Sequence, residues 1–484
     1  MNTTIRLIKN TFYLTIADFF SPFVNVILVI YISRTLGSDG LGAYTAIVAF
    51  LFLIEKFAQM GLHQIIIRDI ARNQKNANQY FVDALVIGFL SSIVSYLVLH
   101  VLLAFIQYPP DITASIKVLG ISIFFFVMKE YFFAFYEGFQ RMEYKSIVSL
   151  FLTFLRTGSG ILVVYLGMGV AELIWALVIT RILVCFISFI YALKLGLRFT
   201  EKPDKKRIFK LLRQTMTFLM ISVITTTYWK IDILMLTKMK NITDVGYYSA
   251  AYRLLDILKG LMTCYISALY PMLAISFGTA QNAFNRQLSL SIKYLFMVTF
   301  PMALGTTILS GPIIYLIYGN SFGPAVLTLQ VLIWTICFFP IAIILARALV
   351  ASNNQRFDLF GNIIALCINL VLNYFLIRQL SELGAALATS ISILVFLFIQ
   401  YFFVYNHVVK LPFLKYLLRP TLASIVMGIA VYFAKGWPLG FSILTGIVVY
   451  IAALFLLRVF TDDEMQLLKR LWREKGMLLK PSQG

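Results

Sequence analysis

The sequence carries very little charge for its length. Only 13% of its 484 residues are Asp, Glu, Lys or Arg, whereas 60% are hydrophobic. A soluble domain of this size needs a surface that is mostly polar, so this balance excludes a soluble globular protein. We therefore expect a chain that is embedded in a membrane.

Cysteine and histidine are few and scattered. The four cysteines lie inside apolar runs without CxxC spacing, which excludes a disulfide framework and gives no indication of a metal site. The three histidines, His63, His100 and His407, form no cluster and are interpreted as interfacial or packed residues. The P-loop pattern of a nucleotide-driven motor is also missing from the sequence. We expect no catalytic residues, no metal and no cofactor.

Positive charge outweighs negative charge, with 41 Lys and Arg against 21 Asp and Glu. These basic residues lie between hydrophobic blocks and do not form one patch interleaved with aromatic side chains, as they do in RNA-binding proteins. The pattern argues against nucleic acid as a partner. It directs attention to the loops of a membrane protein.

Long apolar runs dominate the chain. About 20 apolar residues cover the hydrocarbon core of a bilayer, and this length predicts about fourteen transmembrane helices. The first run is too long for a signal peptide and lacks a cleavage site, so we expect it to be retained. The predicted spans are 11–35, 41–62, 80–106, 112–137, 145–167, 170–194, 211–237, 244–273, 290–316, 325–350, 358–378, 383–407, 415–435 and 438–458.

The loops between these spans differ in positive charge. Most Lys and Arg outside the spans fall in one alternate set of loops and in the two termini. The opposite set holds only Arg34, Lys238, Lys240, Arg378 and Lys435. Because short cytoplasmic loops retain positive charge, this sorting predicts that both termini are cytoplasmic.

Two motifs recur in the same order in the two halves of the chain. Residues Gly42–Ala46 (GAYTA) match Gly246–Ala250 (GYYSA), and Gln140-Arg141 matches Gln355-Arg356. A repeat of six helices starts both copies on the same side of the membrane, which predicts a parallel repeat about an axis along the membrane normal. We expect two six-helix lobes that enclose a central cavity and rock to give alternating access.

The repeat also predicts the domain organisation. We expect an N-lobe over residues 1–200, a basic cytoplasmic linker over 201–210, a C-lobe over 211–410, a peripheral helix pair over 411–460 and a basic cytoplasmic tail over 461–484. All loops are short, which leaves no room for a catalytic domain outside the membrane.

With these features the chain resembles the polysaccharide and O-antigen flippases, the Wzx-type branch of the multidrug/oligosaccharidyl-lipid/polysaccharide (MOP) exporter superfamily. The resemblance rests on Thr35–Tyr44 (TLGSDGLGAY), Gln140-Arg141, Tyr318–Phe322 (YGNSF) with Ala325, and Gly384–Ala386 (GAA). It spans nearly the whole chain. The glycines in these motifs are interpreted as helix caps and close-packing points.

The resemblance implies a MATE-like fold and a flippase. Such a protein moves undecaprenyl-pyrophosphate-linked oligosaccharide across a bacterial inner membrane for O-antigen, capsule or exopolysaccharide synthesis. It implies lipid-linked oligosaccharide and membrane lipids as partners, with a polysaccharide polymerase and chain-length machinery as further candidates. No covalent chemistry is expected.

Charges inside the predicted spans are the candidate site residues, because an ionisable group at bilayer depth is costly unless it faces a partner or a wet cavity. Arg253, Asp256 and Lys259 share one helix face at spacings i, i+3 and i+6. In the preceding span Lys230 and Asp232 point nearly opposite ways, and we expect Lys230 to face the cavity. Cationic donors suit the pyrophosphate of the substrate.

We predict two groups of residues in the cavity. The predicted substrate-binding residues are Arg253, Lys259, Lys230, Lys56, Lys129 and Asn25. The predicted ion-coupling or charge-partner residues are Asp18, Glu55 and Asp256. Each single charge has an alternative role in an interhelical ion pair, such as Arg253 with Asp256 or Arg156 with Glu137. Arg156 and Arg181 are weaker candidates for the cavity.

Three other functions compete with a flippase. A cation-coupled multidrug exporter of the same superfamily needs an acidic or aromatic cavity, whereas the predicted cavity is basic. A membrane polymerase or ligase of sugar chains needs long outer loops with acidic residues. A scaffolding protein gives no reason for charge in the middle of the membrane.

Overall fold

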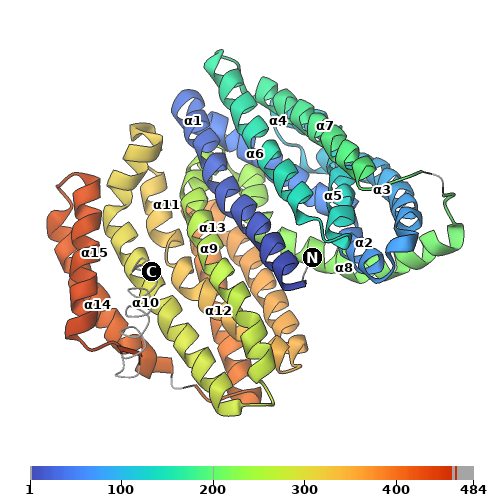
Figure 1. The fold of residues 1–484 in the computed structure, drawn as a ribbon. Coiled ribbons are helices and arrows are strands. Elements are labelled where there is room, and N and C mark those ends of the chain that lie inside the picture. Colours follow the sequence, from blue (N-terminus) through green and yellow to red (C-terminus); the bar gives the residue numbers. More distant parts are fainter. Residues whose placement is uncertain (1–2, 200, 412, 461–463, 466–484) are drawn as a thin grey trace, which may run out of the picture. The chain divides into compact units, whose positions relative to one another are not determined.

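The computed structural model describes residues 3–199, 201–411, 413–460 and 464–465, without the side chains of residues 3–12, 14–19, 217, 221 and 413–415. These residues form α-helices and two short 3-10 helices, and no β-strand occurs among them (Figure 1). The backbone satisfies its own hydrogen bonds within each helix, which is what a lipid environment requires.

The helices follow one another with short connections. In chain order they are α1 (Thr3–Gln59), α2 (Leu62–Arg72), α3 (Ala77–Ile106), α4 (Pro110–Gly120), α5 (Ile123–Gly138), α6 (Met142–Tyr165), α7 (Val170–Lys194), α8 (Lys205–Met239), α9 (Ile242–Ser276), α10 (Gln281–Tyr318), α11 (Ala325–Leu332), α12 (Thr335–Ala351), α13 (Gln355–His407), α14 (Phe413–Ala434) and α15 (Leu439–Leu456). The 3-10 helices are Gln74–Asn76 and Asn320–Phe322.

Among the described residues, 11 helical segments are long and apolar enough to cross a membrane, or up to 12 if the pair α4–α5, bent by 42°, counts as one span. The predicted count of fourteen is not confirmed. Two segments are far longer than one crossing needs, Phe20–Gln59 with 40 residues and Gln355–His407 with 53. Each contains one residue with a non-helical backbone, Gly37 (φ 71°) and Ser381 (φ 50°). Both interruptions lie where the sequence predicts a loop, so fourteen crossings stay a prediction.

The described residues divide into two compact units. The first unit comprises the chain up to Ile257, together with Ile317–Ala325 and Asn369–Ala388. The second unit comprises Leu258–Leu316, Val326–Ile368 and the chain from Thr389 onward. The repeat-related lobes over residues 1–200 and 211–410, and the linker, helix pair and tail defined with them, stay a prediction.

In the first unit α1 packs along α6 and α8, and α5 packs against α2, α3 and α7. Aromatic residues fill the interior: the side chains of Phe81, Tyr131, Phe135 and Tyr136 are fully buried. Large apolar side chains also remain uncovered, for example Phe105, which is 79% exposed. Such exposure suits lipid rather than water as the surrounding solvent.

The repeated motif forms a close helix crossing inside the first unit. A Cβ on Gly42 would lie 2.0 Å from a backbone carbonyl oxygen of α9, and a Cβ on Gly246 would lie 2.0 Å from one of α1. Only glycine allows backbones to approach so closely. Beside the crossing, the Thr243 hydroxyl donates to Asp39 Oδ1 at 2.6 Å. The expected packing role of Gly42 is therefore confirmed, and equivalent residues of the two halves contact each other.

The basic segment before α8 is fixed to α3. Arg207 Nε donates to Asp83 Oδ2 at 2.6 Å, and the backbone N–H of Asp204 donates to Asp83 Oδ1 at 3.0 Å. The hydrogen bond to Asp83 raises the pKa of Arg207, so this guanidinium keeps its charge.

In the second unit α14 packs against α15. A buried ion pair fixes α10 to the C-terminal segment: Lys293 Nζ lies 2.7 Å from Glu464 Oε2, and the Tyr294 hydroxyl donates to Glu464 Oε1 at 2.8 Å. A hydrogen bond also links the two ends of α13, where Gln400 Nε2 donates to Asp358 Oδ1 at 2.7 Å.

Candidate functional site

A cavity of about 270 Å³ lies between α1, α6, α8 and α9 in the first unit. We call it the first cavity. Its polar and charged lining residues are Asn25, Tyr44, Thr45, Arg156, Lys230, Ser249, Tyr252, Arg253 and Asp256. Among the described side chains, three cations therefore face one carboxylate, which gives the cavity an excess of positive charge.

Helix periodicity positions the charged residues of this cavity. Arg253 and Asp256 lie one turn apart on α9, so both reach the cavity from one face, as the spacing predicts. Lys230 enters from α8, and its Nζ lies 5.9 Å from the centroid of the Phe52 ring. Lys230 interacts electrostatically with three charged side chains, those of Asp256, Arg253 and Asp232.

Asp232 is directed away from the first cavity. Its side chain is 4% exposed and accepts hydrogen bonds from the Tyr248 hydroxyl at 2.9 Å and from Asn373 Nδ2 at 2.6 Å. The predicted opposition of Lys230 and Asp232 is confirmed. Asp232 serves the packing of the first unit, because its oxygens are used by neighbouring helices.

Arg253 forms no ion pair within the part of the chain that the structure describes. The alternative pairing of Arg253 with Asp256 is therefore not observed, although the two residues are one turn apart. Arg156 likewise has no carboxylate within ion-pair distance among the described residues. Both guanidinium groups line the first cavity, and no described side chain forms an ion pair with either of them.

Four buried polar atoms around the first cavity have no hydrogen-bond partner among the described residues: Asn25 Oδ1, Tyr44 OH, Arg156 Nε and Ser249 Oγ. Leaving a buried polar group unsatisfied costs about 1–3 kcal/mol. Two hydroxyls, one guanidinium and one amide are the groups that bind oxyanions and sugar hydroxyls. Their convergence on one cavity indicates a site for a polar, anionic ligand.

Two further cavities adjoin the first. A second cavity of about 180 Å³ shares Tyr44, Phe52 and Arg156 with the first and extends between α5, α6 and α7. A third cavity of about 380 Å³ shares Asn25, Arg253 and Asp256 with it. Arg156 thus borders the first and second cavities, and Arg253 borders the first and third.

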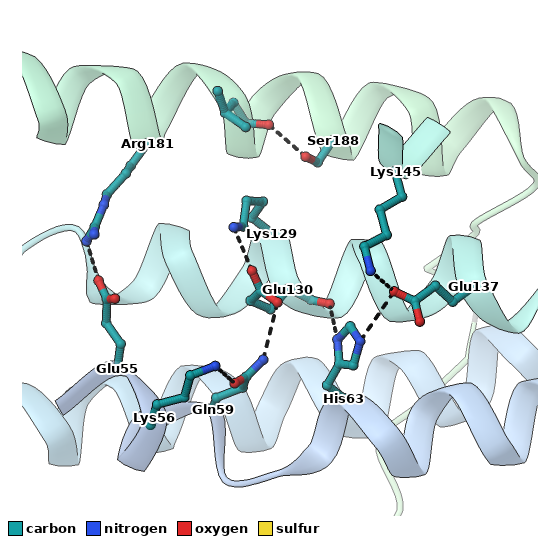
Figure 2. Close-up of polar contacts among 11 residues, drawn as sticks. Glu55, Lys56, Gln59, His63, Lys129, Glu130, Glu137, Lys145, Arg181 and Ser188 are labelled. Carbon is teal, nitrogen blue, oxygen red and sulfur yellow. Dashed lines mark hydrogen bonds and ion pairs between the residues drawn. The ribbon is translucent and has the colours of Figure 1, made fainter. Parts of the chain in front are cut away.

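The charged residues of the second cavity other than Arg156 are paired. Arg181 forms an ion pair with Glu55, which is 1% exposed (Figure 2). Arg181 also donates to Ser122 Oγ at 2.8 Å. Lys129 lies 2.6 Å from Glu130 Oε1. The Arg181–Glu55 pair joins α7 to α1, whereas Lys129 and Glu130 are neighbours on α5.

The pairs continue into a polar network that includes a histidine (Figure 2). Gln59 Nε2 donates to Glu130 Oε2 at 3.4 Å, and His63 Nδ1 lies 3.0 Å from the Glu130 carbonyl oxygen. His63 Nε2 lies 3.5 Å from Glu137 Oε1, which also accepts from Lys145 at 2.5 Å. We call the residues Glu55, Lys56, Gln59, His63, Lys129, Glu130, Glu137, Lys145 and Arg181 the paired network.

The network corrects two expectations. The suggested ion pair of Arg156 with Glu137 is wrong, because Glu137 pairs with Lys145 and His63. His63 is more than a packed residue, since it bridges α2 and α5. A sequence pattern does not reveal this role because the carboxylates lie far from His63 along the chain.

The remaining predicted residues lie elsewhere. Lys56 donates to Gln59 Oε1 at 3.3 Å, and its Nζ lies 5.4 Å from the Phe52 ring centroid. Lys259 belongs to the second unit, where it is 5% exposed and its Nζ lies 5.5 Å from the ring centroid of Phe339. The side chain of Asp18 lies outside the described residues.

Tyr44 and Ser249 were not predicted as site residues, and Arg156 was only a weak candidate. Tyr44 and Ser249 belong to the repeated motif (GAYTA and GYYSA), whose role the sequence indicates only as a turn and packing element. The sequence signal that could have identified these two site residues is that both copies of the motif contain hydroxyl side chains. The place of Arg156 depends on how α6 packs against α1, which no local pattern encodes.

The chain is similar to known proteins along most of its length. The sequence model of the polysaccharide biosynthesis protein family matches residues 7–277, and that of lipid II flippase MurJ matches residues 144–457. The “Probable low-salt glycan biosynthesis flippase Agl15” of Haloferax volcanii is 21% identical over 392 residues, which cover 80% of this chain and 81% of that protein. A Shigella flexneri protein named as an O-antigen transporter is 22% identical over 389 residues, which cover 75% and 89%.

Solved structures share the fold. A lipid II flippase MurJ in an inward closed conformation gives a TM-score of 0.75 at 19% identity and covers 92% of this chain and 98% of its own. An inward-facing multidrug MATE transporter gives a TM-score of 0.65 at 14% identity and covers 83% and 95%. The fold is therefore that of an all-α, multi-pass membrane transporter.

Proposed function

This chain belongs to the polysaccharide biosynthesis protein family of the MOP exporter superfamily, and on this premise we propose that it is a flippase for lipid-linked oligosaccharide. The observation that carries the proposal is the first cavity, where Arg156, Lys230 and Arg253 face the single carboxylate of Asp256. A diphosphate carries at least two negative charges, and it needs cationic donors in order to leave water.

We assign the diphosphate to Arg253 and Lys230, with Asn25 as a polar contact for the sugars. Arg253 has no ion pair among the described residues, so its donors are available to phosphate oxygens. Lys259, Lys56 and Lys129 stay proposed as minor contributors, and Lys129 would contact the substrate from the second cavity. Asp256, Glu55 and Asp18 remain proposed as charge partners or coupling groups.

The finer parts of the proposal come from the sequence and from the relatives. The substrate would be an undecaprenyl-diphosphate-linked repeat unit for O-antigen, capsule or exopolysaccharide, moved by alternating access. The bacterial inner membrane is what the resemblance implies, and the cytoplasmic position of both termini is proposed from the distribution of Lys and Arg among the loops. A polymerase and chain-length machinery would take over the exported unit.

Deletion of the gene in its host tests this function. Lipid-linked oligosaccharide should accumulate on the inner leaflet while surface polymer is lost, and a plasmid copy should restore both. Normal surface polymer without accumulation, in a strain that has no second flippase gene, would contradict the proposal.

A multidrug exporter is the competing function, because MATE transporters share the fold. Its cationic substrates would be repelled by three basic residues around one carboxylate. No observation on the first cavity favours a cationic drug, so we do not propose this function.

A further inference from the structure

Arg156 differs from the other basic residues of the second cavity. Arg181 is paired with Glu55, and Lys129 is paired with Glu130. The basic residues that interact electrostatically with Glu55 are Arg181, Lys129 and Lys56. The negative charge of Glu55 is therefore compensated without Arg156. Among the described side chains, Arg156 is therefore the residue that leaves one positive charge uncompensated where the first and second cavities meet.

Tyr44 lies at the same boundary. It lines both cavities, and its hydroxyl is buried without a hydrogen-bond partner among the described residues, as is Arg156 Nε. A guanidinium edge together with a phenol hydroxyl presents several N–H and O–H donors, and Glu55, a carboxylate that lines the second cavity, is already paired with Arg181. Such a set suits an oxyanion, and a planar carboxylate matches the guanidinium fork.

The volume and the lining residues of the second cavity suit one part of a ligand, such as a single sugar ring, rather than a whole ligand. Its volume of about 180 Å³ is below the range of about 300–1,000 Å³ for drug-sized ligands. Phe52, Phe125 and Phe126 line it and provide flat apolar surfaces beside the charged edge. A sugar ring has an apolar face and a polar rim, which fits this combination.

We propose that Arg156 and Tyr44 form a separate oxyanion site for one carboxylate on a sugar of the transported oligosaccharide. This inference rests on the proposed function and narrows the substrate class to acidic glycans. The oxyanion could also be a phosphate oxygen of the diphosphate. A carboxylate is favoured because one uncompensated cation matches one negative charge, and because Arg253 and Lys230 remain for the diphosphate in the first cavity.

The test uses the purified full chain in proteoliposomes and two synthetic substrates. Both carry a polyprenyl diphosphate and a trisaccharide, and they differ only in having glucuronic acid or glucose at one position. The wild-type protein should translocate the acidic substrate about tenfold faster, the size expected of one hydrogen bond to a charged group. Arg156→Gln should abolish this preference, because it should slow the acidic substrate more than the neutral one.

Three variants complete the design. Arg156→Lys keeps the charge and should retain part of the preference, whereas Tyr44→Phe should reduce it severalfold. Arg253→Gln is the matched control, because it should slow both substrates equally. Each variant is first compared with the wild type by gel filtration and by thermal unfolding in detergent.

Each outcome decides between the alternatives. If the wild type moves both substrates at one rate, or if Arg156→Gln slows both equally, the carboxylate site is overturned, and the second result assigns Arg156 to the diphosphate. If the wild type moves neither substrate, the proposed flippase function itself fails. If Arg156→Gln does not fold, loss of preference in Tyr44→Phe supports the site and an unchanged preference overturns it.

Discussion

The basic residues of the first unit differ in what they contact. In the paired network, Arg181, Lys129 and Lys145 each bind a glutamate, and their charge is neutralised inside the protein (Figure 2). In the first cavity, Arg253 and Arg156 have no such partner among the described residues. All five are arginines or lysines within apolar helices. The difference teaches that charge at bilayer depth serves packing in one region and is available to a ligand in the other.

The largest expected effect comes from breaking the paired network. Glu55→Leu leaves the half-buried Arg181 without its carboxylate, and removing one partner of a fully buried ion pair costs about 3–5 kcal/mol, which is the upper limit here. We expect a clear drop in the thermal unfolding temperature in detergent and a lower protein level in the membrane.

The matched control for this prediction is the double variant Glu55→Leu/Arg181→Leu. It removes both charges and should recover much of the lost stability, because no unpaired charge remains. A single variant as stable as the double variant would show that Arg181 does not depend on Glu55, and the contrast between the two regions would break down.

A smaller effect is expected for Asp256→Asn, and it should strengthen ligand binding rather than reduce stability. Asp256 is the carboxylate of the first cavity and acts on Lys230, so its removal increases the positive potential there. We expect about threefold to tenfold tighter binding of the lipid diphosphate with unchanged unfolding temperature, on the scale of about 1 kcal/mol for a screened charge. Loss of transport in this variant would instead identify Asp256 as a coupling group.

The smallest effect is expected for Lys56→Gln. Lys56 is half-buried, contacts Gln59 and lies over the Phe52 ring, but it does not line the first cavity. Stability should change by less than about 1 kcal/mol, as for an exposed polar pair. Transport should stay within about twofold of wild type, measured with the same proteoliposomes. A larger loss would extend the ligand-binding region into the paired network.

Local helix geometry explains what could be predicted from the sequence. The i, i+3 spacing predicts that Arg253 and Asp256 reach the same cavity, as they do. The two-residue spacing predicts that Lys230 and Asp232 point in nearly opposite directions, and Asp232 indeed contacts Tyr248 instead of lining the cavity. These relations depend only on 3.6 residues per turn. The apolar runs likewise located the helices, since their length reflects the thickness of the bilayer.

Contacts between distant segments could not be predicted in the same way. The partners Glu55 and Arg181 lie 126 residues apart, and Gln59 and Glu130 lie 71 apart. Which helices neighbour each other decides these pairs, and periodicity carries no such information. The count of fourteen crossings stays a prediction, because the helix runs on continuously on both sides of a single non-helical residue at Gly37 and at Ser381.

The central claim is that uncompensated cations of the first cavity carry a lipid diphosphate across the membrane. The most direct measurement is the rate at which lipid-linked oligosaccharide reaches the far leaflet of proteoliposomes that contain wild-type protein or the Arg253→Gln/Lys230→Gln double variant. The account predicts that the double variant folds as the wild type does and transports at least about tenfold more slowly. A double variant that transports at the wild-type rate would contradict it.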